Sequence, residues 1–105
     1  RFDDYPRIGS IVGYNAIKAI GAALEATGGS TDSEALVTAL REVTFATPQG
    51  ELRFRPSDHQ ATMGAWVGYT TVVDGRGTMR DWHYAPGERY LPPEEMVAAR
   101  RPHDD

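Results

Sequence analysis

The sequence predicts an α/β chain in which two helices are followed by short strands and a hairpin. Three observations lead to this fold class. Apolar and small residues recur at three- and four-residue steps over 9–27, a Thr-Asp-Ser-Glu run opens a second helical segment at 31–34, and an Asp-Gly pair at 74–75 separates two β-rich runs. The hydrophobic period therefore changes from helical to extended in the middle of the chain.

The first predicted helix, over 9–27, has a broad apolar face. It carries two adjoining stripes, one made of Ile11, Ile17 and Leu24 and the other of Ile20 and Ala23. Ser10 is the expected N-cap, and the glycines at 28–29 supply a left-handed stop. Because a few short strands cannot cover both stripes, we predict that residues of this chain alone leave part of this helix exposed.

The second helix is predicted to begin at a capping box. Thr31 precedes Glu34 by three residues, so each side chain can accept a hydrogen bond from the backbone N–H of the other. Acidic residues at its start and Arg41 near its end suit the helix dipole. We expect this helix to end near Val43.

Two pairs of strands and a short helix complete the predicted elements. Strands at 44–47 and 51–55 flank a Pro-Gln-Gly turn, and strands at 65–73 and 78–84 flank the Asp-Gly turn. Two prolines at 92–93 open a short helix that runs to Arg100.

Composition excludes several classes of function. The 105 residues carry a net charge of −4 without clustered positive charge, so we expect no nucleic-acid partner. The absence of cysteine excludes a disulfide framework and a thiolate zinc site. Gly75-Arg76-Gly77 lacks the remaining residues of a phosphate-binding loop, and we expect no cofactor.

Catalytic and metal-binding patterns are weak. Ser57, Asp58 and His59 are the residue types of a hydrolase triad, but adjacent residues on one loop do not converge as a triad does, so we interpret them as a solvated loop with local hydrogen bonds. His59 and His83 lack metal-ligand spacing. Glu94 and Glu95 are interpreted as a pair that complements a helix dipole.

Two groups of residues remain as candidates for ligand binding. Aromatic side chains could line a groove for an aromatic ligand, although cross-strand packing in the hairpin is the simpler interpretation; they are Trp66, Tyr69, Trp82, Tyr84 and Tyr90. Gly9 and Ser10 stand at a helix start, where free N–H groups and the positive end of the helix dipole attract carboxylates. Ordinary capping is the alternative there.

The ordered motifs resemble those of extracytoplasmic solute-binding proteins of the branched-chain amino-acid and amide type, which serve ABC importers. The resemblance lies in the Gly13–Gly29 helix with its Tyr14-Asn15-Ala16 start, the Ser33–Leu40 helix, the Phe45–Phe54 hairpin, the Asp58-His59-Gln60 loop and the Val67–Gly75 strand and turn. It covers about residues 9–80 and stops before the Trp82–Asp105 tail.

The resemblance implies a type I periplasmic binding protein fold, in which three strands join two lobes around a ligand cleft. Residues 1–64 would complete the first lobe, and 65–105 would contain a hinge-crossing strand, a second-lobe hairpin and a C-terminal tail. The chain would be the last third of such a protein, in keeping with an opening that has no initiator methionine. The family's ligand contact before the matched helix would fall at Ile8, Gly9 and Ser10.

The implied function is that of a periplasmic component of an ABC importer, without enzymatic activity. It would capture an amino acid, an amide or a small organic acid by cleft closure and deliver it to a membrane permease. Its partners would be the ligand, the upstream remainder of the same protein and the permease. A ligand-sensing domain of the same fold is the alternative, and a small stand-alone enzyme is a third hypothesis without a supporting constellation.

Overall fold

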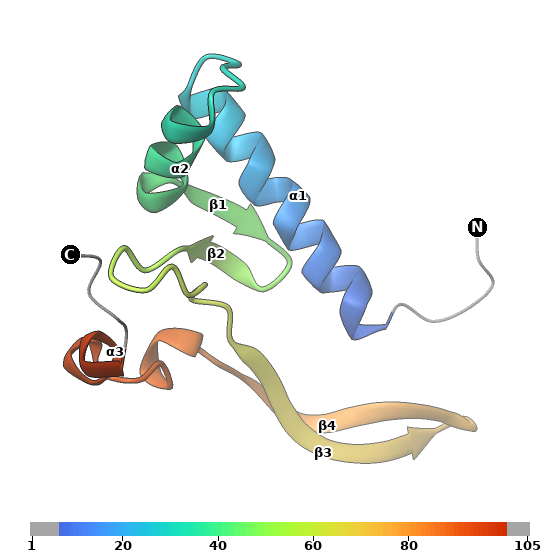
Figure 1. The fold of residues 1–105 in the computed structure, drawn as a ribbon. Coiled ribbons are helices and arrows are strands. Elements are labelled where there is room, and N and C mark those ends of the chain that lie inside the picture. Colours follow the sequence, from blue (N-terminus) through green and yellow to red (C-terminus); the bar gives the residue numbers. More distant parts are fainter. Residues whose placement is uncertain (1–6, 101–105) are drawn as a thin grey trace.

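The computed structural model describes residues 7–100 as two helices, two separate two-stranded sheets and a short helical tail. The elements are α1 (Ile8–Ala26), α2 (Ser33–Glu42), β1 (Thr44–Thr47), β2 (Gly50–Arg53), β3 (Ala65–Val73), β4 (Arg76–Ala85), the 3₁₀ turn η1 (Gly87–Arg89) and α3 (Glu94–Arg100). We call residues 7–64 the body, 65–85 the arm and 86–93 the return segment. Figure 1 shows the arm extending away from the body.

The start of α1 differs from the sequence prediction. The helix begins at Ile8 after an extended Arg7, and no side chain caps it. Ser10 lies inside the first turn, where its N–H donates to the Arg7 carbonyl at 2.8 Å. The prediction of Ser10 as the N-cap is therefore wrong, because the hydrogen-bonded turn closes upstream of it. The left-handed stop is confirmed, since Gly28 and Gly29 have φ values of 64° and 88°.

The start of α2 is also displaced by one residue. Asp32 is the N-cap, and its Oδ2 accepts from the Ala35 N–H at 2.9 Å. The predicted Thr31–Glu34 capping box is thus wrong. A carboxylate at the cap accepts a charge-assisted hydrogen bond and complements the helix dipole, which a threonine hydroxyl does less strongly.

The body contains a small core between α1, α2 and the β1–β2 hairpin. Three buried side chains form it, and five half-buried ones surround it: Ala19, Phe45 and Leu52, then Ala22, Leu40, Val43, Phe54 and Met63. Phe45 pairs with Leu52 across the hairpin, whose turn is Pro48-Gln49; Gly50, the third residue of the predicted turn, instead pairs with Thr47 at the start of β2. The second strand is shorter than predicted, and Phe54 makes only an isolated bridge to Ala61.

The arm is a long, bent hairpin. Its turn has the predicted Asp74 and Gly75, with φ values of 49° and 74° that suit a tight hairpin reversal. The register shifts between Val67 and Tyr69, because Gly68 faces an extra residue of β4 where Asp81 has φ 52°. This bulge bends the hairpin, a feature that the sequence analysis missed.

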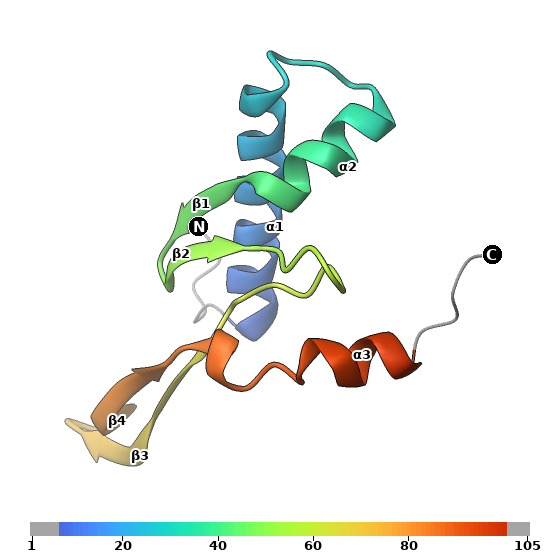
Figure 2. The ribbon, with the colours of Figure 1, turned by 90° about the vertical axis from the view of Figure 1, so that its left-hand side faces the viewer.

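The tail returns toward the body after β4. Figure 2 shows η1 and α3 beside the loop that follows β2, while the arm points away. The predicted final helix is confirmed but begins two residues later, at Glu94, after Pro92 and Pro93. Residues 1–6 and 101–105, the outer ends of the two predicted segments, lie outside the described residues.

The described chain is extended and covers little of its apolar surface. Its radius of gyration is 17.4 Å, whereas a compact domain of this length has about 13 Å. In α1, Ile8 is 84% exposed, Ile17 69% and Ile20 50%, while Ala19 and Ala23 are buried. The prediction that this chain cannot bury both stripes of α1 is confirmed. Within residues 7–100, no helix combines the length and the apolarity needed to cross a membrane.

Candidate functional site

The predicted contact residues Ile8, Gly9 and Ser10 form the exposed first turn of α1. Both ribbon views place this end of α1 toward the arm and the opposite end beside the loop to α2 (Figures 1 and 2). A Cβ atom built on Gly9 meets nothing within 4 Å. The described residues therefore leave open space at the helix start.

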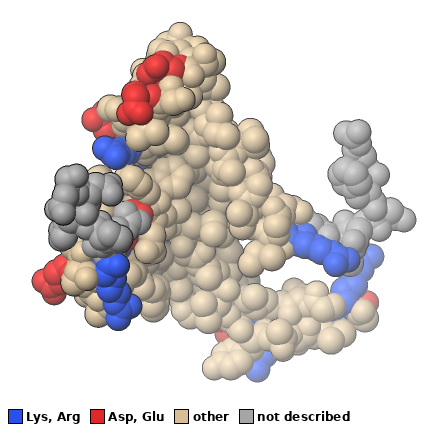
Figure 3. Space-filling model, viewed as in Figure 1, with Lys and Arg blue, Asp and Glu red and all other residues tan. Residues whose placement is uncertain are grey.

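The electrostatics of this helix start favour a negative or polar group. The first turn of α1 contains no acidic residue, and along the whole helix only Lys18 and Glu25 are charged. The positive end of the helix dipole is thus not neutralised from within the helix. Figure 3 shows a surface over α1 that is almost free of charged side chains.

A buried asparagine that is hydrogen-bonded to a half-buried glutamine lies two turns into the same helix. Asn15 is buried, and its Nδ2 donates to Gln49 Oε1 at 2.8 Å and to Met63 Sδ at 3.3 Å. Gln49 Nε2 in turn donates to the Gly64 carbonyl at 3.5 Å. Among the described residues, Asn15 Oδ1 is buried without a hydrogen-bond partner. This network joins α1, the β1–β2 turn and the base of the arm.

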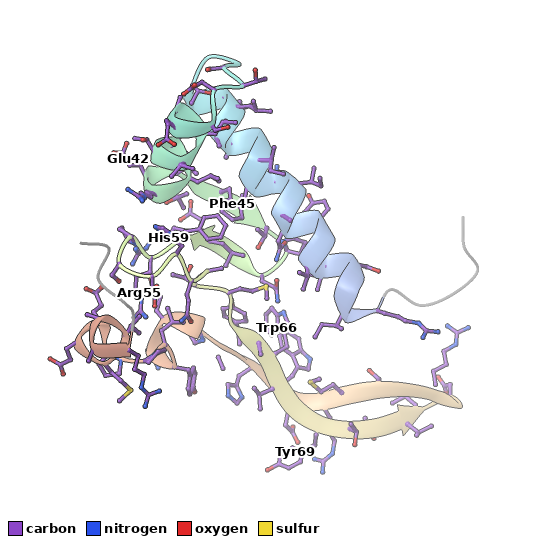
Figure 4. The ribbon with its side chains drawn as sticks, viewed as in Figure 1. Glu42, Phe45, Arg55, His59, Trp66 and Tyr69 are labelled. Carbon is purple, nitrogen blue, oxygen red and sulfur yellow. The ribbon has the colours of Figure 1, made fainter. Side chains whose placement is uncertain are left out.

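The aromatic residues of the arm pack on one another, as the simpler interpretation predicts. Trp66 and Trp82 meet edge to face with ring centroids 5.0 Å apart, and Trp66 lies 5.0 Å from Tyr84, its cross-strand partner. Trp66 remains 45% exposed and Trp82 59%. In Figure 4 the Trp66 side chain lies on the side of β3 toward α1. The packing therefore leaves part of both indole side chains exposed.

The other two predicted aromatics do not join this cluster. The Tyr69 ring packs under the Arg80 guanidinium, 5.2 Å from its centroid. Tyr90 lies outside the arm, in the return segment, and is largely exposed. The structure therefore brings three of the five aromatic side chains together.

The Ser57-Asp58-His59 loop is not solvated as a whole. Asp58 is buried, and both its oxygens accept from Arg55, from Nε at 2.9 Å and from Nη2. Its Oδ1 also accepts from the Gln60 N–H at 3.1 Å, which is the predicted local hydrogen bonding. The expectation of a solvated loop is wrong for Asp58, because the ion pair with Arg55 compensates the burial of the carboxylate.

The hydrogen bonds with Asp58, together with the charges of Asp58 and Glu94, raise the pKa of the Arg55 guanidinium above its ordinary value. A raised pKa for a cation means that its stabilising interaction persists until the pH exceeds that value. Arg55 therefore stays charged at every pH at which proteins normally fold.

The described residues do not form a metal site or a catalytic site from the remaining candidate side chains. Among residues 7–100, no group of three His, Cys, Asp or Glu side chains could hold a metal ion. His59 lies at a cavity of about 210 Å³ whose other lining residues are Val37, Leu40, Arg41 and Phe54. This lining offers no second general acid or base and no nucleophile beside the histidine, so the cavity does not support the hypothesis of a stand-alone enzyme.

Comparison with known proteins identifies the family to which the chain belongs. A family model described as periplasmic binding protein matches residues 1–76. The chain belongs to this family of solute-binding proteins, whose name implies an extracytoplasmic location. No curated protein matches the chain.

A solved structure supports the fold. The chain is similar to the solute-binding protein of an ABC transporter from Rhodopseudomonas palustris HaA2 in complex with p-hydroxybenzoic acid, with a TM-score of 0.62 and 22% identity. The match covers 87% of this chain and 24% of that one. The chain thus has the fold of part of a type I periplasmic binding protein and spans about a quarter of that relative, which confirms the fold class implied by the sequence resemblance.

The contacts that join distant parts of the chain were not predicted from the sequence. Arg55 Nη1 donates to the Pro92 carbonyl at 2.8 Å, and Arg53 Nη2 donates to Glu88 Oε1 at 2.7 Å. The local Arg55–Asp58 pair was not predicted either, although an Arg three residues before an Asp is a spacing that could have indicated it. Nothing in the local pattern indicated the partners 35 and 37 residues away.

Proposed function

We propose that this chain is the C-terminal-side part of a substrate-binding component of an ABC-type importer. In the periplasm, the whole protein captures a small molecule by cleft closure and delivers it to a permease in the membrane. It catalyses no reaction. The family match over residues 1–76 carries this proposal. The similar fold of an ABC transporter's solute-binding protein supports it.

We further propose how the chain divides between the two lobes. Residues 1–64 complete the first lobe, and 65–105 contain the hinge-crossing strand, the second-lobe hairpin and the C-terminal tail. The arm's exposure supports this division, because Val67 and Val72, on its first strand, are 47% and 71% exposed. The remainder of the whole protein would cover such side chains.

The proposed ligand is an amino acid, an amide or a small organic acid. Its anionic or polar group would lie at the first turn of α1, against Ile8, Gly9 and Ser10. The uncompensated positive end of α1 and the open space at Gly9 support this position. The p-hydroxybenzoic acid bound by the relative makes a ring-bearing carboxylic acid a specific candidate, whose ring Trp66 could contact by stacking.

Calorimetric titration of the whole protein tests the ligand class and the site. L-leucine, propionamide and p-hydroxybenzoate represent the three classes, and we expect saturable binding of at least one. With that ligand, Gly9→Trp should abolish measurable binding by blocking closure, and Ser10→Ala should weaken it. Ser33→Ala, in the first turn of α2, is the matched control and should leave the affinity unchanged. Unchanged affinity in both Gly9→Trp and Ser10→Ala would contradict the site.

Deletion of the gene separates the importer from the sensory alternative. An importer component predicts that uptake of the bound ligand is lost and is restored by the intact gene. Normal uptake together with a lost transcriptional response to the ligand would contradict transport and establish sensing.

A further inference from the structure

Two backbone segments cross side by side at the base of the arm. A Cβ atom on Gly64 would lie 2.0 Å from the Ala85 carbonyl oxygen, and one on Gly87 would lie 2.3 Å from the Met63 carbonyl oxygen. The Gly64 N–H also donates to the Tyr84 hydroxyl at 2.9 Å. The outgoing and returning segments are therefore packed backbone against backbone, which requires glycine at both positions.

The return segment is attached to the body by two arginines, Arg53 and Arg55, which stand two residues apart. Glu88 pairs with Arg53 of β2 at 2.7 Å, with both side chains about half exposed. The Pro92 carbonyl accepts from Arg55 Nη1 at 2.8 Å. The attachment therefore spans η1 and the residues after it.

The Arg55 side chain, which donates to the Pro92 carbonyl, is held in place by its own contacts. Its side chain is only 13% exposed, and the Asp58 side chain that it pairs with is fully buried. The bidentate pair fixes the plane of the guanidinium and leaves Nη1 directed at the return segment. In Figure 4, Arg55 lies between the loop after β2 and the tail.

We propose that the return segment is a strap that limits the swing of the arm against the body. Within residues 7–100, an arm joined to the body only through Gly64 would pivot there, because glycine allows a wide range of backbone angles. The second crossing at Gly87 and the anchor at Arg55 restrict that pivot. Under the lobe division proposed above, the strap limits how far the cleft opens, and so biases the open and closed states.

Distance measurements between two spin labels in the ligand-free whole protein test the strap. Cysteines replace the exposed Thr38 of α2 and Thr78 of β4, and this chain contributes no native cysteine. We expect a narrow distance distribution in this background. Arg55→Met, which removes the anchor and keeps an apolar stem, should broaden the distribution and shift it. Arg89→Met, which removes a positive charge within η1, is the matched control and should not.

A second variant covers the case in which Arg55→Met fails to fold, since it leaves Asp58 buried without its cation. A chain that ends after Tyr90 removes the Pro92 carbonyl and preserves the Arg55–Asp58 pair. This variant should broaden the distribution as well. A distribution that stays as narrow as in the parent when the tail is removed would overturn the proposal, and so would equal broadening in Arg89→Met. Because no ligand is present, these outcomes are independent of whether the proposed ligand binds.

Discussion

The body and the arm contain similar apolar residues but differ in what covers them. In the body, Leu52 is 2% exposed and Phe45 6%, because α1 packs across the β1–β2 hairpin. In the arm, Tyr69 is 65% exposed and Val72 71%, although β3 and β4 form the longest ladder of the chain. Strand pairing alone therefore arranges the arm without burying it.

This difference shows which region depends on parts beyond residues 7–100. An isolated two-stranded hairpin is marginally stable in water, and three strands or a packed helix are normally needed. The body has such a helix on its hairpin and the arm has none among the described residues. The arm is therefore the region whose stability should change most when the rest of a two-lobed protein is present.

The largest effect is expected in the core of the body. Leu52→Ala should lower the free energy of unfolding of the whole protein by about 2–5 kcal/mol, because it removes a fully packed side chain and leaves a cavity. Denaturant unfolding measures this. A loss below about 1 kcal/mol would show that Leu52 is not part of a packed core.

Val72→Ala removes an apolar side chain from the arm, and its effect is compared between residues 1–105 alone and the whole protein. In residues 1–105 alone it should leave the circular-dichroism profile on heating unchanged, because Val72 is exposed. In the whole protein it should cost more than about 1 kcal/mol if the second lobe covers the arm. Equal, negligible effects in both contexts would mean that the arm stays uncovered.

The next effect on stability is expected at Gly64, where the body meets the arm. Gly64→Ala should destabilise the whole protein by about 1–3 kcal/mol or more, because the new methyl group meets backbone atoms that cannot move aside easily. Gly77→Ala, in open space on β4, is the control and should be nearly neutral. Thermal unfolding of both variants measures the difference, and a neutral Gly64→Ala would contradict the close crossing.

The smallest effect lies in the aromatic cluster of the arm. A double-mutant cycle with Trp66→Ala and Trp82→Ala should give a coupling of about 0.5–1.5 kcal/mol, the value of an edge-to-face pair. Denaturant unfolding of the whole protein provides the four free energies. Additive effects of the two substitutions would show that the rings do not interact in solution.

The sequence predicted the features that depend on neighbouring residues. Asp74 and Gly75 specify the arm's turn because both positions require positive φ, and Gly28 ends α1 for the same reason. Both N-caps were predicted at the wrong residue, since several polar residues stand near each helix start. Asp32, and not Thr31, is the N-cap of α2, and α1 begins before Ser10.

The features that depend on distant residues were not predictable from the local pattern. The anchoring of the tail by Arg53 and Arg55 depends on how the arm folds back, and the bulge at Gly68 depends on its pairing with β4. The position of the candidate ligand contact came from the family resemblance. The structure shows that this first turn of α1 is exposed, and its role in binding stays a prediction.

We infer that residues 1–105 do not form a self-sufficient fold, because α1 and the arm leave large apolar surfaces uncovered. Circular dichroism during heating, combined with sedimentation velocity, tests it directly on the isolated chain and on the whole protein. We predict that the isolated chain self-associates or unfolds without a cooperative transition, and that the whole protein unfolds cooperatively. A monomeric isolated chain with a sharp two-state transition above about 50 °C would contradict the claim, because such behaviour is that of a complete domain.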